Sequence, residues 1–395
     1  MKFIHAADLH LESPFEGLKS DYIPNDLWEY IYNSTFIAFE KLVQNSIEEK
    51  VDFILLAGDL FDRDTQTPKT YEFFYNQLLK LNEQNIKVFI IFGNHDYLNI
   101  DNNQLDFPNN VYVFGNEVET TTFDLDGEKI AITGFSYSNR WINEKMINKY
   151  PLKQDVDFQI GMLHGSEENT GDNYAPFNLQ ELISKNYNYW ALGHIHKRMK
   201  LNDNPPIMYS GNIQGRHKKE SGPKGYLLVN EKNNQLDISF EETSVIIWDA
   251  LKIKLTQDDF DTIITDLMNK LYKLNYPKMH LLQLELKVDN YQHIINQDEL
   301  LIRIQNTLKK EYQNLNVWIY DIKVIVNKKI VSQIDDEIWQ KAAKDTFNND
   351  QVSNLAQSLN KYDFIQKHLS DDIPNILYQE SQIKILGNKD EDNEN

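Results

Sequence analysis

One unit recurs five times within residues 2–197 and constrains the fold more than any other feature. In each copy a short apolar run typical of a β-strand ends in small residues, and His, Asp or Asn follows at once. The copies read KFIHAADLH, VDFILLAGDLFD, KVFIIFGNHDY, FQIGMLHGS and YWALGHIHK. Segments of helical character, residues 26–49 and 68–84, separate the first three. Strands that alternate with helices predict an α/β layered fold, in which the polar clusters lie at the carboxyl edge of a sheet.

The pattern of the chain changes twice, which predicts a division into domains. After Phe123 the sequence is richer in strands, so we expect a second sheet within a first domain of residues 1–243. Residues 244–330 have a β-α-β-α-β pattern without polar clusters and predict a smaller α+β domain. Residues 331–387 predict amphipathic helices. The last residues, 388–395, are polar and acidic and predict a disordered tail.

The composition limits the chemistry and the compartment. With 41% hydrophobic residues the chain can build a core, and its lack of cysteine excludes disulfides and thiolate ligands. The N-terminus has no apolar signal segment, and no run approaches the ~20 residues that span a bilayer, so we expect a cytoplasmic protein without a membrane partner. A net charge of −20 argues against a surface coated for nucleic-acid binding, although a local basic surface stays open.

The polar clusters together predict a metal centre. A single His beside a strand is usually a structural residue, but five clusters at the same place in the unit are poorly explained in that way. Spacings of the type D-x-H and H-x-H put two side chains on one face of an extended segment. The candidate ligands are Asp8, His10, Asp59, Asn94, His164, His194 and His196.

Seven nitrogen and oxygen ligands suit two divalent ions that one carboxylate bridges. We expect Mn²⁺, with Mg²⁺, Fe²⁺ and Zn²⁺ as alternatives. Two ions ~3.5–4 Å apart are the standard device for displacement at phosphorus, because they activate a water and neutralise phosphoryl charge. The sequence therefore predicts hydrolysis of a phosphate ester.

The motifs carry a family resemblance. In this order, DLH, GDLFD, GNHD, HG and GHIH resemble the five motifs of the calcineurin-like metallophosphoesterases. Within that superfamily AADLHLESPF, AGDLFDR and YSGNIQGRHKKESGPKGY resemble the SbcD-type DNA repair exonucleases, most closely their YhaO-like branch. The resemblance covers roughly residues 1–240. It implies a four-layer α/β/β/α sandwich, with residues 244–330 as a capping domain that shapes access for DNA.

The resemblance also implies roles for single residues. One metal would be held by Asp8, His10, Asp59 and His196, and the second by Asp59, Asn94, His164 and His194. His95 would be no ligand; it would face the scissile phosphate and stabilise or protonate the leaving group, a role that suits a pKa near the working pH. Two interpretations of Asp96 stay open, a carboxylate that orients His95 and a cap of the turn. Asp62 is likewise either a partner of a ligand or a helix cap.

A basic stretch follows the last ligands. Residues 197–224 contain seven Lys or Arg against Asp203 and Glu220, a local net charge of +5. Basic side chains beside a two-metal centre are placed to hold a phosphodiester backbone. We expect substrate contacts from Arg216, His217 and Lys224, while Lys218 and Lys219 could be only a solvated loop.

These observations predict a two-metal-dependent DNA phosphodiesterase, an exonuclease of DNA repair. The resemblance implies an SMC-like coiled-coil ATPase as partner, docked on residues 331–387, although those helices could equally pack on the protein's own body. A homodimer is left open. One alternative is a phosphoesterase that acts on small phosphodiesters or phosphoproteins. The other is a catalytically silent scaffold with the same fold.

Overall fold

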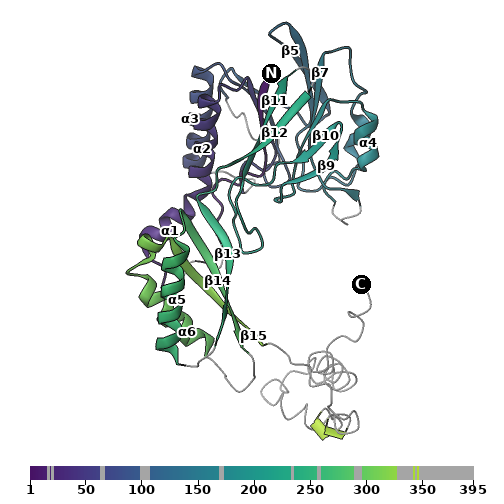
Figure 1. Cartoon of the computed structure of the whole chain (residues 1–395). Helices are drawn as coiled ribbons and strands as arrows, with labels where there is room; N and C mark the ends of the chain where they lie inside the picture. Colours follow the sequence, from purple (N-terminus) through teal and green to yellow (C-terminus); the bar gives the residue numbers. More distant parts are fainter. Residues whose placement is uncertain are drawn as a thin grey trace. The chain divides into compact units, whose positions relative to one another are not determined.

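Figure 1 shows a computed structural model of the chain, which describes residues 1–15, 18, 22–62, 67–97, 107–168, 173–232, 235–255, 259–288, 296–326, 341–342 and 345–346. One compact unit comprises Met1–Ile253, Gln257–Leu286 and Ile295–Lys323. A second comprises Lys254–Thr256, Lys287–Ile294 and Val324–Asn395. The helices predicted for residues 331–387 lie outside the described residues except at 341–342 and 345–346, and the tail at 388–395 lies wholly outside them.

The first sheet contains three of the five predicted strand-plus-cluster units. Its order is β12-β11-β1-β2-β3-β4, and β1 to β4 run parallel while β11 is antiparallel to β1. The strands are β1 (Lys2–Ala6), β2 (Phe53–Ala57), β3 (Lys87–Ile91), β4 (Val111–Val113), β11 (Gly225–Lys232) and β12 (Gln235–Glu242). Phe3 lies opposite Phe53, which in turn lies opposite Lys87, so the clusters after β1, β2 and β3 emerge at one edge.

A second sheet carries the other two units, as expected from the strand-rich pattern after Phe123. Its order is β5-β6-β7-β8-β10-β9, and β6, β7, β8 and β10 run parallel. The strands are β5 (Glu119–Leu125), β6 (Glu128–Gly134), β7 (Phe158–His164), β8 (Tyr189–Gly193), β9 (Met199–Asp203) and β10 (Pro206–Tyr209). His164 lies opposite Gly193, so the clusters of β7 and β8 are also adjacent.

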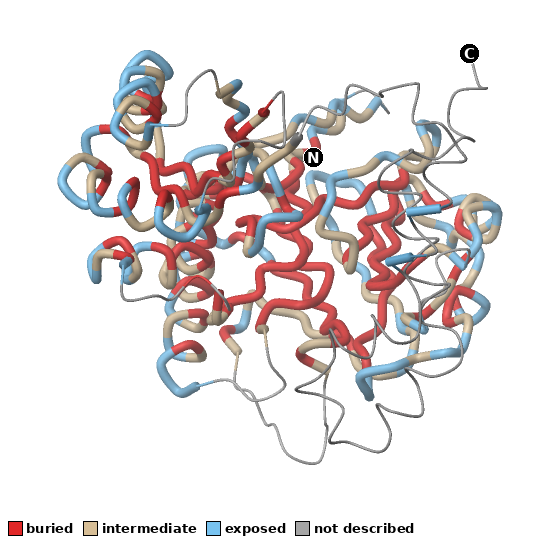
Figure 2. Tube along the Cα trace, turned by 90° about the horizontal axis from the view of Figure 1, so that it is seen from below, coloured by how far each residue is buried: buried red, intermediate tan, exposed pale blue. Residues whose placement is uncertain are grey.

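Alternating side chains of the strands divide the core into layers. Ile4 of β1 belongs to a cluster with the helices α2 (Ser34–Glu48) and α3 (Pro68–Glu83), while Phe3 belongs to a second cluster between the two sheets. A third cluster covers the outer face of the second sheet with α4 (Leu179–Ser184) and the 3₁₀ helix η1 (Met146–Lys149). Figure 2 shows the central strands as buried traces. The predicted four-layer α/β/β/α architecture is confirmed.

The remaining elements form a small α+β arrangement. Its sheet has the order β13-β14-β15, with β13 (Ile246–Lys254), β14 (Met279–Val288) and β15 (Val317–Val326). Its helices are α5 (Phe260–Leu274), α6 (Gln297–Leu308) and the short α7 (Tyr312–Leu315), and a further helix, α1 (Asn25–Tyr32), precedes α2. The Asp259 side chain caps α5, and residues Ile263, Leu267 and Leu271 form its buried stripe. The boundaries at 243/244 and 330/331 stay predictions.

In the part of the chain that the structure describes, no helix combines the length and the apolar character that crossing a bilayer requires.

Candidate metal centre

The candidate ligands lie where the strands of both sheets end. The loops after β1 and β2 are joined by hydrogen bonds from Asp8 N to Gly58 O and from His10 N to Asp59 O, each 3.0 Å. Asp8, His10 and Asp59 have φ values of +53°, +43° and +52°, and His194 has +99°. Our expectation of an extended D-x-H segment is therefore wrong. The backbone is left-handed at these positions, a costly conformation that clusters at functional sites.

Two glycines allow the strand ends of the two sheets to approach. A Cβ on Gly193 would lie 1.9 Å from the carbonyl oxygen of Ala57, so no side chain fits there. Gly58 has a φ of +87°, and a Cβ at this residue would lie 2.3 Å from Nδ1 of His164. Both glycines therefore belong to the construction of the site, because a larger residue would push the ligands of the two sheets apart.

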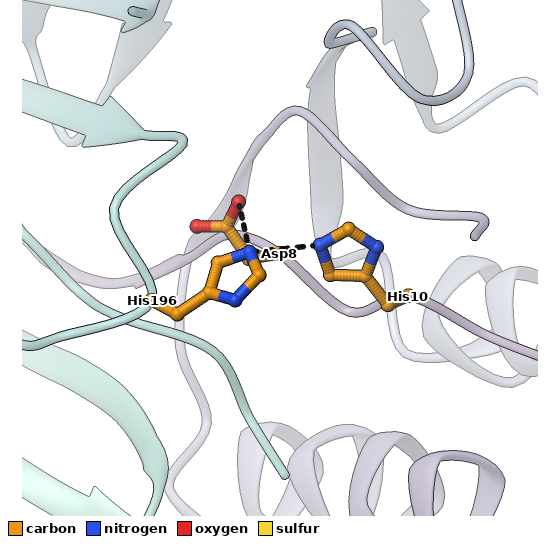
Figure 3. A group of neighbouring side chains, drawn as sticks. All are labelled: Asp8, His10 and His196. Atoms are coloured by element: carbon orange, nitrogen blue, oxygen red, sulfur yellow. Dashed lines mark hydrogen bonds and ion pairs between the residues drawn. The ribbon is translucent and has the colours of Figure 1, made fainter. Parts of the chain in front are cut away.

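The first group of ligands is Asp8, His10 and His196, drawn in Figure 3. The two Nε2 atoms of the histidines lie 3.0 Å apart, and His196 Nε2 lies 3.8 Å from Asp8 Oδ1. On the far side of each ring a carboxylate faces Nδ1: Glu220 at 2.5 Å from His196, and Asp62 at 3.2 Å from His10. The Glu220 carboxylate accepts a hydrogen bond from His196, so His196 Nδ1 carries hydrogen and the Nε2 lone pair of a neutral His196 ring faces His10. Nδ1 of His10 lies near Asp62 but has no hydrogen-bond partner among the described residues, so the hydrogen on that ring is not assigned in this way.

The second group is Asp59, His164 and His194, with Asn94 between the rings. Asn94 Oδ1 lies 3.0 Å from His164 Nε2 and 3.1 Å from His194 Nδ1, and Asp59 Oδ2 lies 3.4 Å from His164 Nε2. The His164 Nδ1 atom donates to the Ala57 carbonyl over 3.0 Å. The Nε2 lone pair of a neutral His164 therefore faces two oxygen acceptors.

Asp59 connects the two groups. Its Oδ2 atom lies 3.4 Å from His164 Nε2 in the second group and 3.8 Å from His10 Nε2 in the first. Lone pairs that converge in a buried site repel one another unless a proton or a cation lies between them. A divalent cation fits each group, and Asp59 lies where a bridging carboxylate is needed. The structure brings all seven predicted ligands together.

The electrostatics of the site reflect its buried charges. Burial lowers the pKa of His164, but the carboxylates of Asp59 and Asp8 and the Ala57 carbonyl together outweigh burial and raise that pKa to about 9. Burial, reinforced by the charge of His164, lowers the pKa of His194 to about 3. Burial opposes ionisation of Asp59, yet the histidines around it hold its pKa well below the usual value. Asp59 is thus an anion against a cationic His164, and a bound metal ion would replace the proton of His164.

His95 lies beside the first group, with its ring 4.9 Å from the His10 ring. Its Nδ1 atom lies 3.1 Å from the Asp62 carbonyl oxygen, which can only accept, so Nδ1 carries the hydrogen and Nε2 is left to meet a substrate. His10, Asp62 and His95 also have potential ligand atoms within 4.8 Å of one another. The Asp62 carboxylate lies 3.2 Å from Nδ1 of His10 and pairs with the guanidinium of Arg216, which favours the interpretation of Asp62 as a partner of a ligand.

Asp96 takes the second of its two predicted roles. Its Oδ1 accepts from Gly93 N over 2.7 Å, and its Oδ2 accepts from Leu60 N over 2.6 Å and Phe61 N over 3.2 Å. The carboxylate of Asp96 thus caps the loop after β3 and ties it to the loop after β2. The His95 ring is held instead by the backbone carbonyl of Asp62. Burial and the charge of Asp59 raise the pKa of Asp96 to about 7, and the three N–H donors favour its ionised form.

The predicted substrate contacts lie at the first group. The Arg216 guanidinium pairs with Asp62 and is 14% exposed, and its buried Nε has no hydrogen-bond partner. Lys224 Nζ donates to the carbonyl of His196 over 3.2 Å. His217 is exposed, with Nε2 at 3.2 Å from Glu220. Whether these three residues contact substrate stays a prediction. Arg216 and Lys224 also support the structure of the site, through Asp62 and through the carbonyl of His196.

Sequence reasoning missed Glu220, which it counted only as an acid in a basic stretch. Its carboxylate is 6% exposed and accepts from Arg216 N over 2.7 Å and from Asn212 Nδ2 over 2.9 Å, besides facing His196. Burial opposes ionisation, but these partners, led by His196, lower the pKa of Glu220 to about 2. The sequence did contain a signal for Glu220, because it is one of only two acids in the basic stretch that follows the predicted ligands His194 and His196.

Comparison with known proteins agrees with this geometry. Residues 1–198 match the profile of the family described as calcineurin-like phosphoesterase. An uncharacterized metallophosphoesterase YhaO from Bacillus subtilis is 40% identical over 286 residues, which cover 70% of each chain. The DNA double-strand break repair protein Mre11 of Thermoplasma acidophilum is 25% identical over 86% of this chain and 82% of its own. A component of the nuclease SbcCD from Staphylococcus epidermidis is 26% identical over 74% of this chain and 80% of its own.

Proposed function

Because the chain belongs to the calcineurin-like phosphoesterase family, we propose that it is a two-metal phosphodiesterase that acts on DNA as an exonuclease of DNA repair. The family implies a metal-dependent phosphoester hydrolase. The substrate class is the proposed part, and it is supported by the names of the Thermoplasma and Staphylococcus relatives. The observation that carries the hydrolase itself is the pair of ligand groups that share Asp59.

The proposal assigns each metal to one group. The first would be held by Asp8, His10, Asp59 and His196, and the second by Asp59, Asn94, His164 and His194. When bound, two divalent ions, Mn²⁺ in our proposal, polarise the phosphodiester and supply a water that is acidic near neutral pH. Glu220 holds the ring of His196 by its Nδ1 hydrogen, which fixes where the Nε2 atom of His196 points, and the Asp62 carboxylate lies 3.2 Å from Nδ1 of His10.

His95 is the proposed catalytic residue outside the ligand set. The Asp62 carbonyl accepts the Nδ1 hydrogen of His95, which leaves Nε2 directed to the substrate. In its protonated form Nε2 would donate to the leaving oxygen as the P–O bond breaks, and it would take up a proton from solvent afterwards. Asp96 acts indirectly, because it holds the loop that carries Asn94 and His95 against the loop that carries Asp59.

The proposed partner follows from the name of one relative. The Staphylococcus relative is named as one subunit of the SbcCD nuclease, so we propose that this chain also works with a second protein, an SMC-like ATPase. The proposed docking segment, residues 331–387, lies almost entirely outside the described residues. A homodimer likewise stays a proposal.

One experiment separates the candidate functions. The purified protein is incubated with Mn²⁺ and, in parallel, with end-labelled duplex DNA, an aryl phosphodiester and a phosphopeptide, using Asp59→Ala as the inactive control. The proposal predicts progressive shortening of the labelled DNA. Hydrolysis of the small ester or the phosphopeptide but never of DNA, even with an ATPase partner added, would contradict the nuclease assignment. Bound metals without hydrolysis of any substrate would identify a scaffold.

A further inference from the structure

An exposed pair of side chains, Arg140 and Trp141, lies on the loop between β6 and η1. Trp141 leaves 61% of its surface exposed, and the Arg140 guanidinium carbon lies 5.6 Å from the centre of its ring. A single exposed apolar residue is common on protein surfaces and by itself identifies no ligand.

The backbone next to Trp141 is anchored at the metal centre. Ile142 N donates to Asn173 O over 3.2 Å, and Ile142 O accepts from Ala175 N over 2.7 Å, so the loop pairs with the segment around Tyr174. The Tyr174 ring packs on the ring of His194, a candidate ligand, with 4.5 Å between centroids. The Arg140–Trp141 pair therefore lies on a loop fixed to the second ligand group through one intervening residue.

Arg140 differs from the other charged residues of this region. Lys149 pairs with Glu144 at 3.0 Å, and Lys145 pairs with Glu168 at 2.7 Å, so these charges are compensated within the protein. Among the residues that the structure describes, no carboxylate pairs with Arg140. The loop thus offers a cation that has no carboxylate partner among the described residues, beside an exposed aromatic ring. Together they match a ligand that is both anionic and planar.

We propose that Trp141 stacks on an unpaired nucleobase of a strand bound at the metal centre, and that Arg140 contacts the adjacent phosphate; this inference rests on the proposed nuclease function. Stacking on aromatic side chains and contacts to phosphates are the two means by which proteins hold single strands. In a chain with a net charge of −20, such local contacts have to replace general attraction to a polyanion.

The proposal specifies the form of the substrate. Lys224 donates to the carbonyl of His196, a ligand of the first group, whereas the Trp141 loop is anchored beside His194 of the second. A strand held at both ligand groups would contact Lys224 beside the first group and the ring of Trp141 beside the second. In a duplex the faces of the bases are covered by their neighbours, so only a frayed or single-stranded end offers a base to Trp141.

The test compares the wild type and its variants on two strands. Fluorescence anisotropy measures binding of a labelled, hydrolysis-resistant phosphorothioate oligonucleotide to the Mn²⁺-loaded full chain, for the wild type and for Trp141→Ala. The same strand with abasic sites removes the stacking partner. We expect Trp141→Ala to bind the normal strand about 5-fold or more weakly, since stacking contributes about 1–3 kcal/mol per base. The abasic strand should bind both proteins equally, and Trp141→Phe should restore most of the affinity.

Leu152→Ala is the matched control, because Leu152 is an apolar residue with 65% exposure that the proposal leaves out of the binding site. If Trp141→Ala weakens binding no more than Leu152→Ala, or weakens the abasic strand equally, the stacking proposal is overturned while the nuclease function stands. If the wild type neither binds nor cuts DNA, the proposed function fails and this inference fails with it.

Discussion

Replacement of Glu220 by Gln tests how the chain positions its first ligand group. The Glu220 carboxylate accepts from three donors, His196 Nδ1 at 2.5 Å, Arg216 N at 2.7 Å and Asn212 Nδ2 at 2.9 Å. Glutamine keeps the shape but loses the charge, and its NH₂ group must face one of these donors. The His196 ring then loses the partner that fixes its Nδ1 hydrogen and strengthens Nε2 as a ligand.

The expected loss of metal affinity is confined to the first ligand group. Removal of such a partner typically lowers metal affinity about 10- to 100-fold, or about 1.4–2.7 kcal/mol of binding free energy. Titration of the metal-free protein with Mn²⁺, followed by isothermal calorimetry and by the electron paramagnetic resonance of free Mn²⁺, should show one weakened site and one unchanged site. His194, a ligand of the second group, has no contact with Glu220 among the described interactions, which is why that site should keep its affinity.

Glu181→Gln is the control, because Glu181 also binds a backbone N–H and a cation, Asn178 N and Lys145, but does so on α4. It should leave both metal affinities unchanged. Equal weakening of the two sites in Glu220→Gln, or an affinity indistinguishable from that of Glu181→Gln, would refute the assignment of Glu220 as the positioning residue of His196.

Three further predictions follow from the same geometry. His95→Ala should keep both metals and lose turnover by about 10²-fold or more, whereas Asp59→Ala should lose both metals; equal metal loss in the two variants, measured by elemental analysis, would contradict this division. Because the pKa of His164 is raised to about 9, this residue carries a proton at pH 7, and metal binding should release about one proton per chain. The released proton makes the calorimetric enthalpy of metal binding depend on the buffer. This dependence should vanish above pH 9, where His164 has already lost its proton. Asp96→Asn should destabilise the fold by about 1–3 kcal/mol in denaturant titrations, because the asparagine NH₂ group cannot accept from the N–H groups of Gly93 or Leu60; unchanged stability would exclude the capping role.

The features that sequence reasoning predicted are local ones. Each ligand follows directly after an apolar strand, so its position at a sheet edge could be read from the few residues before it. The strand-rich pattern after Phe123 likewise predicted the second sheet, which the structure contains.

The features that it missed depend on distant contacts. Glu220 is 24 residues beyond His196, and only the folding of the intervening loop brings the two together. Asp96 is adjacent to His95, yet its carboxylate turns to Leu60 and Phe61, more than 30 residues earlier in the chain. The D-x-H spacing indicated an extended segment, but φ is positive at both Asp8 and His10. Spacing along the chain predicts which residues meet and not how the backbone brings them there.

The central claim is that seven side chains hold two divalent ions which Asp59 bridges. A crystal of the protein soaked in Mn²⁺ tests it most directly through the anomalous scattering of the metal. We predict two peaks ~3.5–4 Å apart, one beside Asp8, His10 and His196 and one beside Asn94, His164 and His194, with Asp59 between them. A single peak, or a peak bound to the His95 ring, would contradict the account.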